Sequence, residues 1–134
     1  MKIDNFYVGQ TAEFTKKITD SDVREFANIS GDFNYIHLDD ERAMDTIFKG
    51  RIVHGILVAG LISKVIGTQL PGEGSIYLSQ EVKFLKPVRV EDSVKAVVTI
   101  TDINKEKSIV ILHTECFIDD NIKVIDGEAK VKVI

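Results

Sequence analysis

The sequence predicts an α+β fold in which a curved antiparallel sheet packs around one long apolar helix. Apolar residues recur at helical spacing in the first half of the chain and alternate with polar residues over most of the second half. The length of 134 residues is that of one ordinary domain, and no repeat or Pro/Gly/Ser-rich linker divides it. We therefore expect one domain over residues 1–134.

Three helices are expected in the first half. Thr19 and Asp22 form a T-x-x-D arrangement, an acidic variant of the capping box, so a short helix should begin there and end near Gly31. The next segment opens as a loop, and the acidic residues 39–41 then favour a second short helix, because carboxylates are stabilised at a helix N-terminus. Residues 54–69 are apolar on nearly every side, which predicts a long helix wrapped by other structure.

Extended segments account for most of the remaining chain. The alternation of apolar and polar residues over 76–84 predicts a strand, and Pro87 closes it. Further extended segments are expected around 13–18, 94–100 and 109–118 and in a last strand ending at 130–134, with polar turns at 102–107 and 119–121. The sheet should therefore have four strands or more.

Charge and composition exclude several classes of partner. The net charge is -4 with both signs interspersed and no basic block, so nucleic acid is not an expected partner. His54, Ser63 and Lys64 interrupt the most apolar window, which is too short to cross a bilayer. The single cysteine, Cys116, lies in an apolar strand and is expected to be an inert packing thiol. Together with a start that lacks an apolar signal segment, it indicates a cytoplasmic protein.

The segment SGDFNYIH carries the first candidate chemistry. Asp32 and His37 lie five residues apart in a predicted loop, where a carboxylate and an imidazole can share one water and exchange protons near neutral pH. Taken alone, the spacing equally fits a capping aspartate and a packed histidine. Asn34 between them is a typical turn residue, because its side chain bonds the nearby backbone.

The segment GRIVHG leads into the long helix. The N–H of Gly55 at the positive end of that helix can stabilise an oxyanion, although Gly50 and Gly55 also fit a simple tight turn. His54 can be a base or a structural histidine, and Arg51 a salt-bridge partner or a phosphate contact. Ser63, two turns later, can bond its own helix backbone or reach the site.

Metal and nucleotide sites are not expected. The three histidines, His37, His54 and His113, lack the close spacing of metal ligands, and neither H-x-x-x-H nor C-x-x-C occurs. No glycine-rich nucleotide fingerprint of the G-x-G-x-x-G or P-loop type is present. The sequence therefore predicts no metal and no cofactor.

The order of four segments resembles one family. SGDFNYIHLDDERA, GRIVHGILVAGLIS, QLPG and VKFLKPVRVEDSV together are similar to the MaoC-like, (R)-specific enoyl-CoA hydratases, also called hydratase 2, which have the hot dog fold. The family motif is a D-x-N-P-x-H loop followed by V-H-G, and this chain matches it from Asp32 to His37 and from Val53 to Gly55. Tyr35 departs from it, because it stands where the family usually has proline.

The resemblance implies a reaction and a set of roles. Asp32 and His37 would hold and activate the water that adds to a trans-2-enoyl-CoA, giving the (R)-3-hydroxyacyl-CoA. The Gly55 N–H would bond the thioester oxygen, and Ser63 would assist, with Asn34 and His54 also placed at the substrate. Which member of the Asp32 and His37 pair is the acid and which is the base stays open.

Three alternatives remain on the same scaffold. The chain can be a 3-hydroxyacyl-carrier-protein dehydratase, a hot dog acyl-CoA thioesterase or a non-catalytic acyl-CoA-binding domain. The order D-x-N-x-x-H then V-H-G fits hydration better than hydrolysis of the thioester. A short acyl chain, such as that of crotonyl-CoA, is the mild preference. The resemblance and the open edge of such a sheet both predict a homodimer, with higher oligomers left open.

Overall fold

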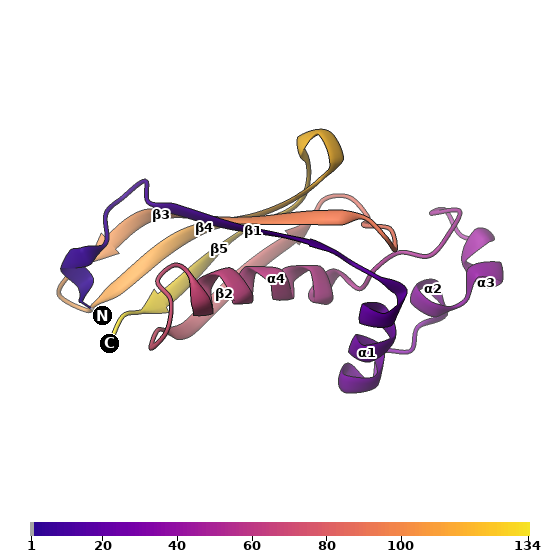
Figure 1. Cartoon of the computed structure of the whole chain (residues 1–134), viewed down its shortest axis with the longest axis horizontal. Helices are drawn as coiled ribbons and strands as arrows, with labels where there is room; N and C mark the ends of the chain where they lie inside the picture. The colour runs from indigo at the N-terminus through magenta and orange to yellow at the C-terminus, as the bar shows by residue number, and fades with distance from the viewer. Residues whose placement is uncertain (1) are drawn as a thin grey trace.

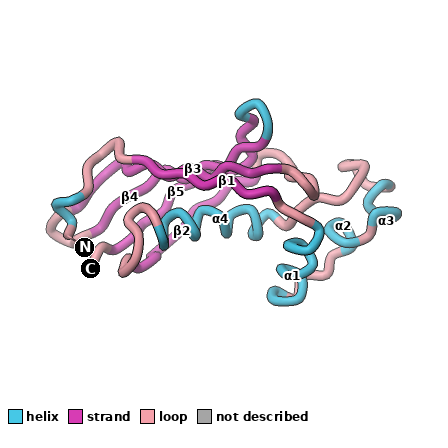
Figure 2. Tube along the Cα trace, viewed as in Figure 1, coloured by secondary structure: helices cyan, strands magenta, loops and turns pink. Residues whose placement is uncertain are grey.

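The computed structural model describes residues 2–134 as one antiparallel sheet with a helix along its concave face (Figure 1). In chain order the elements are η1 (Ile3–Asn5), β1 (Thr11–Lys17), α1 (Asp20–Ser30), α2 (Tyr35–Leu38), α3 (Asp40–Met44), α4 (Gly55–Thr68), β2 (Ile76–Phe84), β3 (Ser93–Asn104), β4 (Ile109–Ile118), η2 (Asp119–Asn121) and β5 (Ile122–Lys132). The five strands lie in the order β1-β3-β4-β5-β2. The helices α1, α2 and α3 gather at one end of the elongated sheet (Figure 2). The predicted α+β class and the hot dog arrangement are confirmed.

The helix boundaries follow the signals in the sequence. Both hydrogen bonds of the Thr19 and Asp22 capping box are present, and Gly31 ends α1 in the left-handed conformation at φ 81°. Asp39 caps α3 by accepting from the N–H of Arg42. The short helix α2 was not expected, because its four residues lie in the segment predicted as a loop.

The core lies between α4 and the concave face of the sheet. Alternate residues of β3 and β4 point toward α4 and are buried, in keeping with the predicted alternation. The buried side of α4 consists of Val58, Leu61, Ile62, Val65 and Ile66. Each such side chain contributes roughly 1.5–3 kcal/mol when it leaves water. Cys116 is buried among these residues, and burial raises the pKa of its thiol to about 12, as expected of an inert packing residue.

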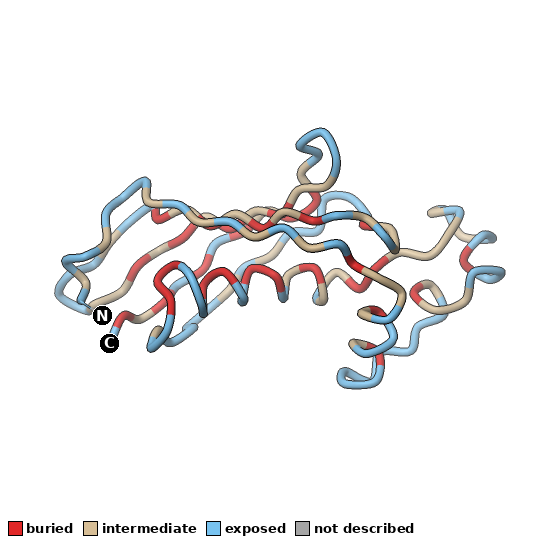
Figure 3. Tube along the Cα trace, viewed as in Figure 1, coloured by how far each residue is buried: buried red, intermediate tan, exposed pale blue. Residues whose placement is uncertain are grey.

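One expectation about burial is wrong for the single chain. The helix α4 is not wrapped on every side: Ile56, Gly60 and Ser63 are exposed, and in Figure 3 its buried residues face the sheet. Strand β2 is also largely exposed, and a register irregularity between Tyr77 and Ser79 breaks its alternation. The physical reason is shared, because β2 is an edge strand beside the open side of α4 and the single chain has no layer to cover either.

No helix among residues 2–134 is long and apolar enough to span a membrane.

Candidate active site

The loop between α1 and α2 presents the predicted carboxylate. One carboxylate oxygen of Asp32, Oδ1, accepts from the N–H of Asn34 at 3.1 Å, which folds the loop into a turn. Asn34 then caps α2, its Oδ1 accepting from the N–H of Ile36 at 3.2 Å. The side chain of Asn34 thus makes the turn contact that its residue type suggested. The Asp32 side chain stays about half exposed and is free to meet a ligand.

His37 lies in α2 and is held in one tautomer by the backbone. Its Nδ1 lies 2.8 Å from the carbonyl oxygen of Ile52. Because a carbonyl only accepts, Nδ1 carries the hydrogen, and the lone pair of the neutral ring is on Nε2. That Nε2 faces Oδ2 of Asp32 at 3.9 Å.

Burial sets the charge state of His37. Desolvation is the largest effect and lowers its pKa below the ordinary 6.5, and the nearby His54 and Arg51 also lower it. The hydrogen bond to Ile52 and the charge of Asp32 act in the opposite direction without reversing the shift. The imidazole is therefore neutral at pH 7 and has an unshared electron pair on Nε2.

Asp32 and His37 face each other across a gap of about one water diameter. At 3.9 Å, Oδ2 and Nε2 are too far apart for a direct hydrogen bond. The gap has the width that one water needs to lie roughly 2.8 Å from each atom. The structure thus brings together the two residues that the sequence placed five positions apart.

His54 contacts both members of this pair. Its side chain is buried, and its Nε2 lies 3.0 Å from the backbone oxygen of Asp32, to which it donates. Its ring stacks on that of His37 with 3.8 Å between centroids, and Phe26 packs edge-on against the same His54 ring with 4.8 Å between centroids. The sequence grouped His54 with the substrate-binding residues, whereas the contacts it makes here are with the protein.

Asp32, His37 and His54 together have three potential metal-ligand atoms. Ligand atoms of Asp32, His37 and His54 lie within 4.8 Å of one another, and Nδ1 of His54 is buried without a partner among residues 2–134. The two rings, however, are stacked at an interplanar angle of 25°. Nearly parallel rings 3.8 Å apart cannot both aim in-plane lone pairs at one ion about 2.1 Å away. This arrangement does not fit a metal.

Gly55 begins α4 beside these residues. The first N–H groups of a helix have no acceptor within it, and no side chain caps this terminus. A Cβ on Gly55 would lie 2.6 Å from Cε1 of Phe84. Its backbone is outside the left-handed region, unlike that of Gly50 at φ 154°, so a tight turn does not require glycine at Gly55. A side chain at Gly55 would therefore require the Phe84 ring to move.

An apolar cavity adjoins Gly55. Its volume is about 400 Å³, and its walls include Gly55, Val58, Phe84 and Ile125. Ile52, whose carbonyl oxygen holds His37, also lines it. The cavity thus lies next to the first residue of α4 and has space for an apolar chain.

Ser63 is not brought to the Asp32 and His37 pair. It lies on α4 eight residues after Gly55, a rise of roughly 12 Å along the helix axis. Its side chain is on the exposed side of the helix. The contribution of Ser63 stays a prediction, and it depends on what covers that side.

Arg51 is a site residue whose role sequence reasoning left open. Its side chain is only 9% exposed and forms an ion pair with Asp20 at 2.5 Å. Its Nε donates to the backbone oxygen of His37 at 2.6 Å. The only signal in the sequence was its place in GRIVHG, which did not reveal these partners because they come from different helices.

The fold and the site define a hot dog protein with a carboxylate and an imidazole 3.9 Å apart and a helix N-terminus without a side-chain cap. The model of the MaoC like domain matches residues 5–116, and the chain belongs to this family.

Relatives with assigned names agree with this membership. The chain is 47% identical over 125 residues to an (R)-specific enoyl-CoA hydratase of Rhodospirillum rubrum, a match covering 93% of this chain and 86% of that protein. It is 45% identical to a 3-hydroxybutyryl-CoA dehydratase of Methylorubrum extorquens, covering 97% and 82% of the two chains. The solved structure of an (R)-hydratase from A. caviae involved in PHA biosynthesis superposes with a TM-score of 0.94 at 43% identity, covering 96% of this chain and 98% of that one.

Proposed function

We propose that this chain is an (R)-specific enoyl-CoA hydratase, which adds water reversibly to a trans-2-enoyl-CoA to give the (R)-3-hydroxyacyl-CoA. The observation that carries the proposal is the gap of 3.9 Å between Oδ2 of Asp32 and Nε2 of His37, which fits one shared water. The named relatives support the substrate class, because they are hydratases and dehydratases of CoA thioesters.

In the hydration direction, the water oxygen bonds the β-carbon of the enoyl thioester. Nε2 of His37 accepts the proton that the water loses, since this atom has the free lone pair of a neutral ring. Asp32 accepts a hydrogen bond from the same water and orients it. The electron pair of the double bond moves toward the thioester, and a proton returned by the pair to the α-carbon completes the addition. The enzyme regains its initial protonation state without a cofactor.

Gly55 stabilises the charge that develops on the thioester oxygen. Its N–H lies at the positive end of α4 and is free of an intrahelical acceptor. A donor that is already oriented contributes most where charge appears in the transition state. The acyl chain then lies in the adjoining cavity of about 400 Å³, and we place short substrates such as crotonyl-CoA there.

The working unit is a homodimer formed through β2. The other edge strand, β1, exposes Thr11, Glu13, Thr15 and Lys17, which protect an edge from pairing. In contrast, β2 exposes Ile76 and Leu78, and Ile56 is exposed on the adjacent side of α4. A second copy covers these apolar groups and the side of α4 that includes Ser63. We place this dimer in the cytoplasm, in keeping with its buried free thiol and its CoA substrate.

The test is the loss of ultraviolet absorbance when purified protein is mixed with crotonyl-CoA. We expect hydration by the wild type and losses of at least about 100-fold in Asp32→Asn and in His37→Gln, with unchanged circular dichroism. Free thiol is measured in the same samples, since a thioesterase releases CoA and a hydratase does not. Rates on carrier-protein thioesters identify the dehydratase alternative, and binding without turnover identifies a non-catalytic domain.

A further inference from the structure

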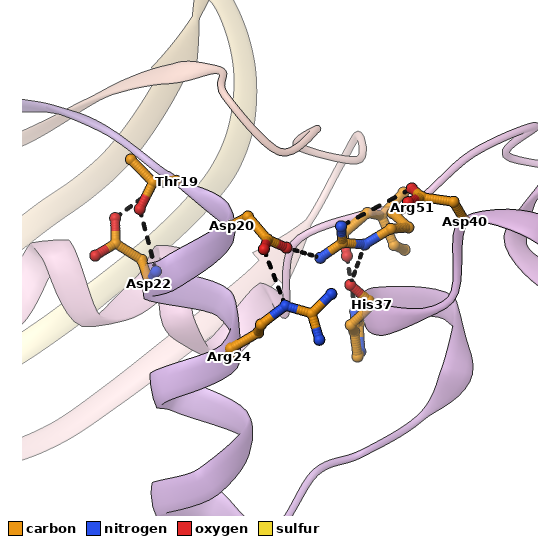
Figure 4. A network of polar contacts seen from close by, with 8 residues as sticks. Thr19, Asp20, Asp22, Arg24, His37, Asp40 and Arg51 are labelled. Atoms are coloured by element: carbon orange, nitrogen blue, oxygen red, sulfur yellow. Dashed lines mark hydrogen bonds and ion pairs between the residues drawn. The ribbon is translucent and has the colours of Figure 1, made fainter.

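Arg51 is a buried cation that contacts α1, α2 and α3 from the segment before α4. Figure 4 shows its guanidinium between Asp20 and Asp40, with Nε directed at the backbone oxygen of His37. The ion pairs measure 2.5 Å to Asp20 and 3.8 Å to Asp40, and the hydrogen bond to His37 measures 2.6 Å. The contact with His37 is to its main chain, so Arg51 holds the residue and leaves the imidazole free to react.

Ile52, the residue after Arg51, binds the backbone of Ile36 and the side chain of His37. The N–H of Ile52 donates to the oxygen of Ile36 at 3.1 Å, and the Ile52 oxygen accepts from Nδ1 of His37 at 2.8 Å. The four residues of α2 form too short a helix to be stable alone. The position of the His37 ring therefore depends on where Arg51 and Ile52 are fixed.

Asp20 fixes the guanidinium in turn. It lies in the first turn of α1, where it also pairs with Arg24 at 2.9 Å. Hydrogen bonds from Arg24 and Arg51 lower the pKa of Asp20, so it is ionised at neutral pH. Arg24 binds the same carboxylate from an exposed position on the helix surface, without a contact to His37. Arg24 is thus a matched control for Arg51, because both bind Asp20 and only Arg51 contacts His37.

We propose that Arg51 is a positioning residue for hydration, anchored by Asp20, which aims Nε2 of His37 at the water shared with Asp32. This inference rests on the proposed function and deepens it. A salt bridge that only stabilised the fold would affect the melting temperature and leave the turnover rate of the folded enzyme unchanged. A positioning role instead lowers kcat, because displacement of a reacting group by about 1 Å costs about 100-fold in rate.

The experiment compares Arg51→Met, Arg51→Lys and Asp20→Asn with the control Arg24→Met, using kcat and KM for crotonyl-CoA and thermal melts. We expect kcat to fall about 10- to 100-fold in Arg51→Met with little change in KM, in the range set by a small displacement of the base. Arg51→Lys should recover part of the loss, because it keeps the positive charge and one donor nitrogen. Asp20→Asn should lower kcat by a smaller factor, and Arg24→Met should match the wild type.

A second readout does not need turnover. In nitrogen NMR of the histidine rings, wild-type His37 should have its hydrogen fixed on Nδ1, and Arg51→Met should show a mixture of tautomers, whereas Arg24→Met should not. Wild-type kcat and a fixed Nδ1–H in folded Arg51→Met would overturn the inference, as would equal losses in Arg51→Met and Arg24→Met. If the wild type does not hydrate enoyl-CoA, the proposed function fails, and the NMR result alone decides whether Arg51 positions His37.

Discussion

Replacement of Gly55 by alanine separates the role of this residue in catalysis from its role in folding. The new Cβ would lie 2.6 Å and 2.8 Å from two carbons of the Phe84 ring, against an ordinary contact of about 3.5–4.0 Å. The ring must therefore move by about 1 Å. It can do so at low cost because Phe84 is 54% exposed. Alanine also gains roughly 0.5–1 kcal/mol over glycine in a helix. These effects oppose each other, so the melting temperature should change little.

The effect on activity should be much larger. The added methyl group stands beside the N–H that donates to the thioester oxygen, next to the cavity that Gly55 lines. Alanine keeps the N–H, but its methyl group holds the thioester oxygen away from it, and a developing oxyanion that loses one donor loses about 100- to 1000-fold in rate. We expect kcat for crotonyl-CoA to fall about 100-fold in Gly55→Ala, measured by the initial rate of absorbance loss.

Two further variants make this prediction refutable. Gly67→Ala lies on the same helix, where the added Cβ meets nothing within 4 Å, and should keep wild-type activity. Phe84→Leu in the Gly55→Ala background removes the clashing ring. Near-wild-type turnover in folded Gly55→Ala, or full recovery in the double variant, would refute the claim that a methyl group at residue 55 blocks the approach of the thioester oxygen to the N–H.

Three other predictions follow from burial and exposure. The pKa of His37 is lowered, so activity should decline only below pH 6.5. As the pH falls below 6.5, His37 is protonated in the unfolded state before it is protonated in the folded state, which lowers the free energy of unfolding. The melting temperature of the wild type should therefore drop more at low pH than that of His37→Gln. Cys116, with a pKa raised to about 12, should resist iodoacetamide at pH 8 until urea unfolds the chain, as judged by mass spectrometry. Leu78→Lys on the β2 edge should yield monomers in light scattering, whereas Thr15→Lys on β1 should not; a dimeric Leu78→Lys variant would argue against the β2 interface.

Local signals in the sequence predicted most of the fold. The capping box at Thr19 and the glycine at Gly31 gave both ends of α1, and alternation gave the strands of the second half. The open side of α4 could not be predicted in this way. Apolar residues such as Ile56 have the same pattern whether a sheet of the same chain or a second copy covers them.

The site was predictable only where a short motif carries the chemistry. Asp32 and His37 were found from one loop, because their spacing in sequence also places them close in space. The tautomer of His37 depends on the carbonyl of Ile52, and the placement of Arg51 depends on Asp20 from an earlier helix. Backbone acceptors have no signature in the sequence, and long-range ion pairs need the fold to bring them together.

The central claim is that Asp32 and His37 direct one water to one face of an enoyl thioester. Chiral analysis of the product from crotonyl-CoA in the presence of the wild type tests it most directly. The account predicts (R)-3-hydroxybutyryl-CoA as the product, with no free thiol and with formation abolished in Asp32→Asn and His37→Gln. A predominantly (S) product, release of CoA, or full activity in either variant would contradict it.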